Sequence, residues 1–174
     1  HRNYSNLNVK VITLDKIYQE FSSGKQDIGA IRNLVKYVYF NASVDSKRVK
    51  YLNLFGDASF DYKNRIPNNT NIVPVFHSLN SESLLSSTMS DDFYGMMDPH
   101  EGRMINQSNL PGFEALDIAV GRMLVSSVQQ AKEMVDKVIQ YHDINSYGRW
   151  RNNFTLVSDD VDESWENQIQ TGID

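Results

Sequence analysis

The sequence contains no cysteine, which excludes a disulfide, a thiolate metal site and a cysteine nucleophile within these 174 residues. These residues show no signal-peptide pattern and no apolar run near the roughly 20 residues that a membrane-spanning helix requires. We therefore expect no direct membrane span. A lack of cysteine is compatible with an exported bacterial protein, although cytosolic proteins can lack it too.

Basic residues are also sparse, since 17 Lys and Arg stand against 22 Asp and Glu, for a formal net charge of -5. No basic cluster offers a track for phosphates, so we expect no nucleic-acid partner. No Lys or Arg follows Arg151, whereas this end carries Asp159, Asp160, Asp162, Glu163, Glu166 and Asp174. Length and a 40% hydrophobic content suit about one globular domain with a real core.

Two apolar runs end in acidic residues, and they organise the prediction. The run Val49 to Phe55 is nearly continuous in hydrophobicity, which is typical of a strand covered on both faces in a parallel sheet. Gly56 allows a turn, and Asp57 follows it. The run Phe154 to Val157 ends in Ser-Asp-Asp. Because open α/β sheets bind ligands at the carboxyl edge of their strands, we expect the chemistry there.

The segment before the first of these runs predicts one strand and two helices. Val9 to Leu14 is the strand, and Asp15 is the expected cap of a short helix from Lys16 to Phe21. Asp27 is expected to cap the next helix. Its apolar residues recur at the spacing of one buried face: Ile28, Ile31, Leu34, Val35 and Val38.

A long irregular region from Ser59 to Leu116 carries all four prolines and is rich in Asn, Ser and Gly. It contains one plausible strand, Ile72 to Phe76. Insertions of this length are usually functional or disordered, and the aromatic residues here favour an ordered covering loop.

Regular structure is predicted to resume with a strand from Leu116 to Val120. Ser127 and Gln130 have the spacing of a capping box for a helix whose Glu133 and Lys137 form an i,i+4 pair. The order of elements indicates a layered α/β sheet. The chain begins at His1 without Met and ends inside an expected helix, so we interpret it as part of a longer protein.

Several ordered motifs resemble the gingipain-type cysteine peptidases, and among them the sortase-like peptidases of the type IX secretion system of Bacteroidetes. These motifs are VITLDKIYQEFSSGKQDIGAIRNLVKYVY, YLNLFGDASFDYKNR, SDDFYGMMD and LDIAVGRMLV. The resemblance implies a caspase-like, mostly parallel sheet with helices on both faces and a long irregular insertion. It also implies that residues 1–150 form the first subdomain and that residues 151–174 open the second, catalytic one.

In that family a Cys thiolate attacks the peptide carbonyl, a His acts as general acid and base, and backbone amides stabilise the oxyanion. This chain has no Cys, and its histidines lack the His-Gly strand-end setting of the family. We therefore expect the fragment to be inactive alone. The resemblance makes Asp159, or alternatively Asp160, the carboxylate that orients the missing His.

The resemblance carries further expectations. Asp160, Asp162 and Glu163 are possible calcium ligands, although this loop is shorter than the family's, and no other cofactor is required. Asp57, Asp117, Arg122 and Asp162 are expected to line or flank the substrate cleft. The expected partners are the rest of the catalytic domain and exported cargo proteins with C-terminal sorting signals. The parent protein would be exported and associated with the cell surface or outer membrane.

Simpler interpretations stay open for the single residues. Asp57 could accept backbone N–H groups within a turn instead of binding a ligand. Ser90-Asp91-Asp92 could be a helix cap ahead of Phe93 and Tyr94 instead of a pair of metal ligands. Arg122 could form an internal salt bridge with Asp57 or Asp117 instead of binding a carboxylate of the substrate.

Two rival functions also remain. In a magnesium-dependent phosphohydrolase or receiver-like domain, the motif Asp160-Val161-Asp162 would hold the nucleophile and the ion. Against this, the chain ends too soon after the motif to supply the further Lys and acid pair that such sites recruit. The other rival is a non-catalytic module that binds a partner through the region from Ser59 to Leu116.

Overall fold

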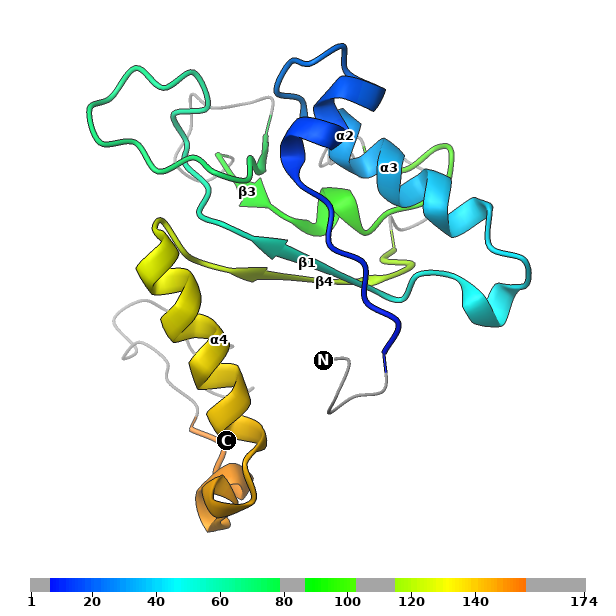
Figure 1. Cartoon of the computed structure of the whole chain (residues 1–174). Helices are drawn as coiled ribbons and strands as arrows, with labels where there is room; N and C mark the ends of the chain where they lie inside the picture. Colours follow the sequence, from blue (N-terminus) through cyan, green and yellow to red (C-terminus); the bar gives the residue numbers. More distant parts are fainter. Residues whose placement is uncertain (1–6, 79–86, 103–114, 156–174) are drawn as a thin grey trace, which may run out of the picture. The chain divides into compact units, whose positions relative to one another are not determined.

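The structure is a computed structural model, and it describes residues 7–78, 87–102 and 115–155. The chain divides into two compact units, His1–Val135 and Asp136–Asp174, and each is described by itself below. Figure 1 shows the elements and their labels.

The first helix begins earlier than the sequence predicts. Residues 7–13 form no strand, so the predicted strand from Val9 to Leu14 is wrong, and α2 spans Leu14–Phe21. Thr13 is the N-cap in place of Asp15, which lies in the first turn. The apolar spacing explains the error, because Ile17 and Tyr18 repeat at helical intervals after Leu14 and are buried.

The second helix, α3, spans Ile28–Phe40 and confirms the predicted cap. Asp27 is extended, and its Oδ1 accepts a hydrogen bond from the Gly29 N–H at 2.7 Å. Ala30, Ile31 and Val35 are buried on one face. A turn with Gly24 at φ 80° separates α3 from α2.

A parallel pair of strands joins distant parts of the chain. The strand β1, Tyr51–Phe55, pairs with β4, Ala119–Met123, in a register that sets Tyr51 opposite Ala119 and Phe55 opposite Met123 (Figure 1). Parallel pairing confirms the predicted α/β class. The predicted strand from Leu116 to Val120 starts three residues too early, and Gly121 and Arg122 lie within β4.

One face of this pair packs against α2 and α3. Leu54 is buried in a cluster with residues of both helices, and Leu52 and Val120 pack against it. The side chains of the opposite face remain accessible, with Tyr51 62% and Phe55 40% exposed. In the described residues, the strand β1 is therefore covered on one face and not on both.

The segment between β1 and β4 is irregular, as predicted, yet it supplies much of the core. It contains the 3-10 turn η2 (Asp92–Tyr94) and a short antiparallel pair, β2 (Phe76–His77) with β3 (Met89–Ser90). An earlier 3-10 turn, η1 (Asp45–Lys47), precedes β1. Among the described residues of the segment, the buried hydrophobic side chains are Val73, Val75, Phe93, Tyr94, Met96, Met97 and Ile118, and the buried acid is Asp61. The predicted strand from Ile72 to Phe76 is realised only at its last residue, since Pro74 has no N–H to donate.

The helix α4, Val128–His142, has the predicted cap but no buried side chain. The Gln130 N–H donates to Ser127 Oγ at 3.2 Å, and Gln130 Oε1 accepts from the Ser126 N–H at 2.7 Å. Glu133 accepts from Gln129 at 2.8 Å, and the described residues contain no ion pair between Glu133 and Lys137.

Two short 3-10 turns, η3 (Ile144–Ser146) and η4 (Arg149–Asn152), follow α4 in the second unit. Phe154 is 92% exposed, and the predicted strand from Phe154 to Val157 lies partly outside the described residues.

Candidate functional site at the carboxyl edge of the parallel strands

The chain turns sharply at the carboxyl end of β1. Gly56 has φ 153°, and a Cβ there would lie 2.8 Å from the Cγ2 atoms of Ile72 and Val73, so only glycine fits. Its N–H donates to the Met123 carbonyl at 3.0 Å. This close turn fixes where the next residue, Asp57, leaves the sheet.

The backbone of Asp57 is fully engaged while its carboxylate is not. The Asp57 N–H donates to the Val125 carbonyl at 3.0 Å, and its own carbonyl accepts from the N–H groups of Ile72 and Val73 at 2.9 Å each. Within the described residues the partly exposed carboxylate accepts no hydrogen bond. The expected turn is therefore made by the backbone, and the side chain is open to a ligand.

Arg122 is an internal residue, with its side chain 9% exposed. Its guanidinium binds both carboxylate oxygens of Asp91. Nη2 donates to Oδ1 at 2.6 Å, and Nε donates to Oδ2 at 2.8 Å. It also donates to the carbonyls of Gly56, Val73 and Pro74 at 2.9, 2.7 and 3.3 Å. These five acceptors match the five N–H groups of an arginine, so none is left for a substrate carboxylate.

The predicted internal salt bridge of Arg122 thus exists, but its partner is Asp91 and neither Asp57 nor Asp117. The turn at Ser90 is made by Ser90 Oγ, which accepts from the Asp92 N–H at 3.1 Å just before η2. Asp91 is the N-cap residue of η2 by position, but its side chain makes no cap hydrogen bond. Its role is to hold Arg122.

Asp117 does not share the edge that carries Asp57. It precedes the amino end of β4, and its Oδ2 accepts from the Met97 N–H at 2.7 Å. Asp57 follows the carboxyl end of β1. Because β1 and β4 are parallel, the two acids lie at opposite ends of the pair. Asp117 is at the amino end of its strand whether the strand begins at Leu116 or at Ala119, so the expected gathering with Asp57 fails.

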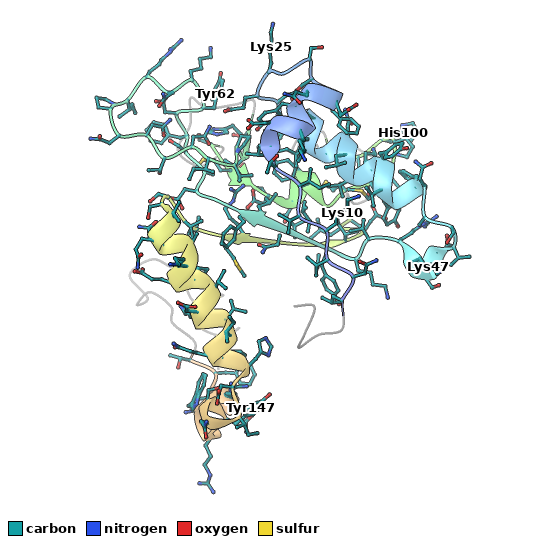
Figure 2. The ribbon with its side chains drawn as sticks, in the orientation of Figure 1. Lys10, Lys25, Lys47, Tyr62, His100 and Tyr147 are labelled. Atoms are coloured by element: carbon teal, nitrogen blue, oxygen red, sulfur yellow. The ribbon has the colours of Figure 1, made fainter. Side chains whose placement is uncertain are left out.

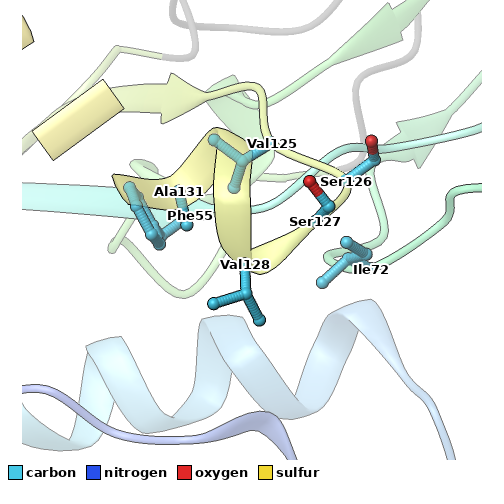
Figure 3. Close-up of a pocket in the computed structure, with 7 residues that line it drawn as sticks. All are labelled: Phe55, Ile72, Val125, Ser126, Ser127, Val128 and Ala131. Atoms are coloured by element: carbon cyan, nitrogen blue, oxygen red, sulfur yellow. The ribbon is translucent and has the colours of Figure 1, made fainter. Parts of the chain in front are cut away.

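A small apolar pocket lies at the same edge as Asp57 (Figure 3). Its volume is about 280 Å³, and it is lined by Phe55, Ile72, Val125, Ser126, Ser127, Val128 and Ala131. Val125 and Ile72 are two of the three residues whose backbone groups bond to Asp57. Small-molecule sites usually occupy roughly 300 to 1,000 Å³, so this pocket suits a single apolar side chain better than a cofactor.

The remaining predicted site residues, Asp159, Asp160, Asp162 and Glu163, lie outside the described residues. In residues 7–78, 87–102 and 115–155, no group of three or more acidic or histidine side chains could hold a metal ion. No helix in these ranges is long and apolar enough to cross a membrane.

Two structural residues escaped the sequence prediction. Asp61 is 8% exposed, and its Oδ2 accepts from the N–H groups of Arg65 and Ile66 at 2.5 and 2.7 Å. Tyr94 is fully buried and donates to the Pro74 carbonyl at 2.6 Å, and burial raises the pKa of its hydroxyl. The Asp and Asn residues around Asp61 are typical of side-chain-stabilised turns and could have indicated its role. No local pattern indicates that of Tyr94.

Comparison with known proteins decides the family. The family model for peptidase family C25 matches residues 1–174. The chain belongs to peptidase family C25, the gingipain family of cysteine peptidases. No curated protein matches this C25 chain.

A solved structure agrees with that assignment. The C25 chain is similar to the structure described as dimeric latent PorU from Porphyromonas gingivalis, with 27% sequence identity and a TM-score of 0.64. The match covers 88% of this chain and 15% of the PorU chain. The C25 chain is therefore a gingipain-like α/β region similar to part of PorU.

Proposed function

We propose that this chain is the supporting subdomain of a longer, surface-associated cysteine peptidase that removes C-terminal sorting signals from exported cargo proteins. The observation that carries the proposal is the family match over all 174 residues, joined to the likeness to PorU. The match favours a peptidase over the phosphohydrolase.

The catalytic thiolate must come from elsewhere in the parent protein, because the chain has no cysteine. We propose that the histidine base comes from there too, because the histidines of this chain lack the His-Gly setting of the family. There the thiolate would attack the scissile carbonyl, and the base would protonate the leaving amine. We propose that this chain supplies one wall of the cleft. Asp57, whose carboxylate has no partner among the described residues, and the apolar pocket at the same edge support this role.

The first experiment compares this chain with the longer parent protein. We expect the chain alone to cleave no peptide that carries a C-terminal sorting signal. The parent should cleave it and lose that activity after alkylation with iodoacetamide, since alkylation blocks a thiolate. A parent that resists alkylation, or cleavage by this chain alone, would contradict the proposal.

A second experiment addresses the acidic loop of the parent. If Asp159 orients the catalytic imidazole, Asp159→Ala should lower turnover and lower the apparent pKa of the histidine, because a nearby carboxylate stabilises the imidazolium. Asp160→Ala is the matched control, and a pKa shift in that variant alone would transfer the role to Asp160.

We also propose that Asp160, Asp162 and Glu163 bind calcium in the parent. Addition of Ca²⁺ should then raise the unfolding temperature of the parent, and Asp160→Asn should abolish the rise. An equal rise in the variant would remove this loop as the calcium site.

A further inference from the structure

The loop formed by residues 59–71 directs large apolar side chains outward. Phe60 is 66% exposed, Tyr62 53% and Ile66 47%. Tyr62 and Lys25 lie on the same side of the molecule in Figure 2, and Gln26 Nε2 donates to the Tyr62 carbonyl at 3.4 Å. Exposed aromatic side chains in one short loop are typical of surfaces that bind another protein.

This loop is ordered although it contains no regular secondary structure. The buried carboxylate of Asp61 accepts the two backbone N–H groups described above, and the Asp61 carbonyl accepts from Asn69 Nδ2 at 2.7 Å. The Ser59 N–H donates to Asn71 Oδ1 at 3.2 Å, which ties the two ends of the loop together. A loop held in this way loses little conformational entropy when it binds a partner.

The exposed charge of the 59–71 loop is positive. Lys63 and Arg65 are exposed, and neither forms an ion pair within the described residues. Lys63 Nζ lies 5.4 Å from the centre of the Tyr62 ring. The one acid of the loop, Asp61, is buried, so the loop is a cationic site on a chain of net charge -5.

We propose that the 59–71 loop is a docking site for an acidic polypeptide segment that carries apolar side chains. Carboxylates of the partner would pair with Lys63 and Arg65, and its apolar side chains would pack on Phe60 and Tyr62. Two cations are too few for an anionic membrane, where recognition takes clusters of about four to eight. The inference does not depend on the proposed peptidase function.

The test uses the 174-residue chain and a fluorescein-labelled peptide of glutamate, phenylalanine and serine. Fluorescence anisotropy should show binding that weakens as the ionic strength rises, because the charge pairs are exposed. The double variant Lys63→Glu/Arg65→Glu and the double variant Phe60→Ser/Tyr62→Ser should each raise Kd about tenfold or more. Circular dichroism would verify that both variants fold.

Matched control variants outside the 59–71 loop test whether binding depends on this loop or only on the overall charge and hydrophobicity of the chain. Lys47→Glu in η1 and Val11→Ser, which is 84% exposed, should leave Kd within about twofold, as is usual for sites outside an interface. A peptide with lysine in place of glutamate should not bind. The proposal is overturned if the glutamate peptide binds no better than the lysine peptide, or binds both loop variants as well as the original chain. Binding to phosphatidylglycerol vesicles that depends on the same four residues would overturn it in favour of a lipid surface.

Discussion

The helix α4 and the irregular segment between β1 and β4 reverse the usual association of regular structure with the core. All 15 residues of α4 are helical, and none of them is buried. In the part of the irregular segment that the structure describes, the strands are two residues long each, yet its Tyr94 and Met97 are the largest fully buried side chains of the described residues. Backbone regularity and burial are therefore separate properties in this chain.

Two arginines explain how an irregular backbone can enter the core. Arg122 donates to three carbonyls of the segment, and Arg32 of α3 donates to the Met96 carbonyl at 2.7 and 2.9 Å and to the Glu101 carbonyl at 2.9 Å. Arg32 also lies 5.0 Å from the centre of the Phe93 ring. Buried carbonyls that no helix or sheet satisfies thus obtain their donors from side chains.

The largest expected effect comes from removing one of these donors. Arg122→Ala should lower the free energy of unfolding by about 3 to 5 kcal/mol, because Asp91 and three carbonyls lose their partner. Urea denaturation would measure it. The control is Arg48→Ala, whose pair with Asp45 is exposed and should cost no more than about 1 kcal/mol. Equal losses in the two variants would refute the role assigned to Arg122.

Alkaline pH should be the next most disruptive condition. Burial, with smaller contributions from Asp27 and Asp15, raises the pKa of Tyr18 in α2 to about 12 from 10.0. The unfolded state then loses its proton first, so stability falls as pH rises from 10 to 12, by at most about 1.4 kcal/mol per pH unit for this tyrosine. Urea denaturation across this range should show a shallower fall in Tyr18→Phe. An identical slope would contradict the assignment.

A pair of hydroxyl deletions compares the irregular segment, which contains Tyr94, with the helix α2, which contains Tyr18. Tyr94→Phe removes the hydrogen bond to the Pro74 carbonyl and should cost about 1 kcal/mol. The Tyr18 hydroxyl is buried without a hydrogen-bond partner among the described residues, so Tyr18→Phe should be neutral or stabilising near pH 7. Thermal denaturation of both variants measures the difference. A larger loss in Tyr18→Phe would reverse the expected order.

The smallest effect is expected in α4. Val135 is 46% exposed, so Val135→Ser should change the stability of this chain by no more than about 0.5 kcal/mol. Val73→Ser, at a position 5% exposed in the irregular segment, is the matched comparison and should cost several-fold more. Chemical denaturation of the two variants would measure the contrast, and equal effects would remove it.

Sequence reasoning succeeded where the determining interactions are local. The cap at Asp27 and the capping residues Ser127 and Gln130 depend on neighbours within four positions, and each was predicted. The run from Val9 to Leu14 failed because its β-branched residues favour a strand, while no partner strand pairs with it in the described residues. Strand pairing is a long-range event that one stretch of sequence cannot specify.

The same distinction applies to the candidate site. The Gly56-Asp57 turn at a strand end was predicted from adjacent residues, and the structure places it there. The partner of Arg122 was not predicted, because Asp91 is 31 positions away and we considered only Asp57 and Asp117 from the sequence. The separation of Asp57 from Asp117 follows from the parallel pairing of β1 with β4, because Asp57 comes after its strand and Asp117 comes before its strand. The roles of Asp159 and its neighbours stay predictions.

The pairing of β1 with β4 also has a kinetic consequence. These strands are neighbours in space, but the whole irregular segment lies between them in the chain, so their pairing closes a long loop. Chains dominated by such distant pairings fold slowly, in roughly milliseconds to seconds. We expect stopped-flow refolding to place β1–β4 pairing after formation of α2 and α3. During synthesis, the chain would have to leave the ribosome as far as Met123, the last residue of β4, before β1 and β4 could pair.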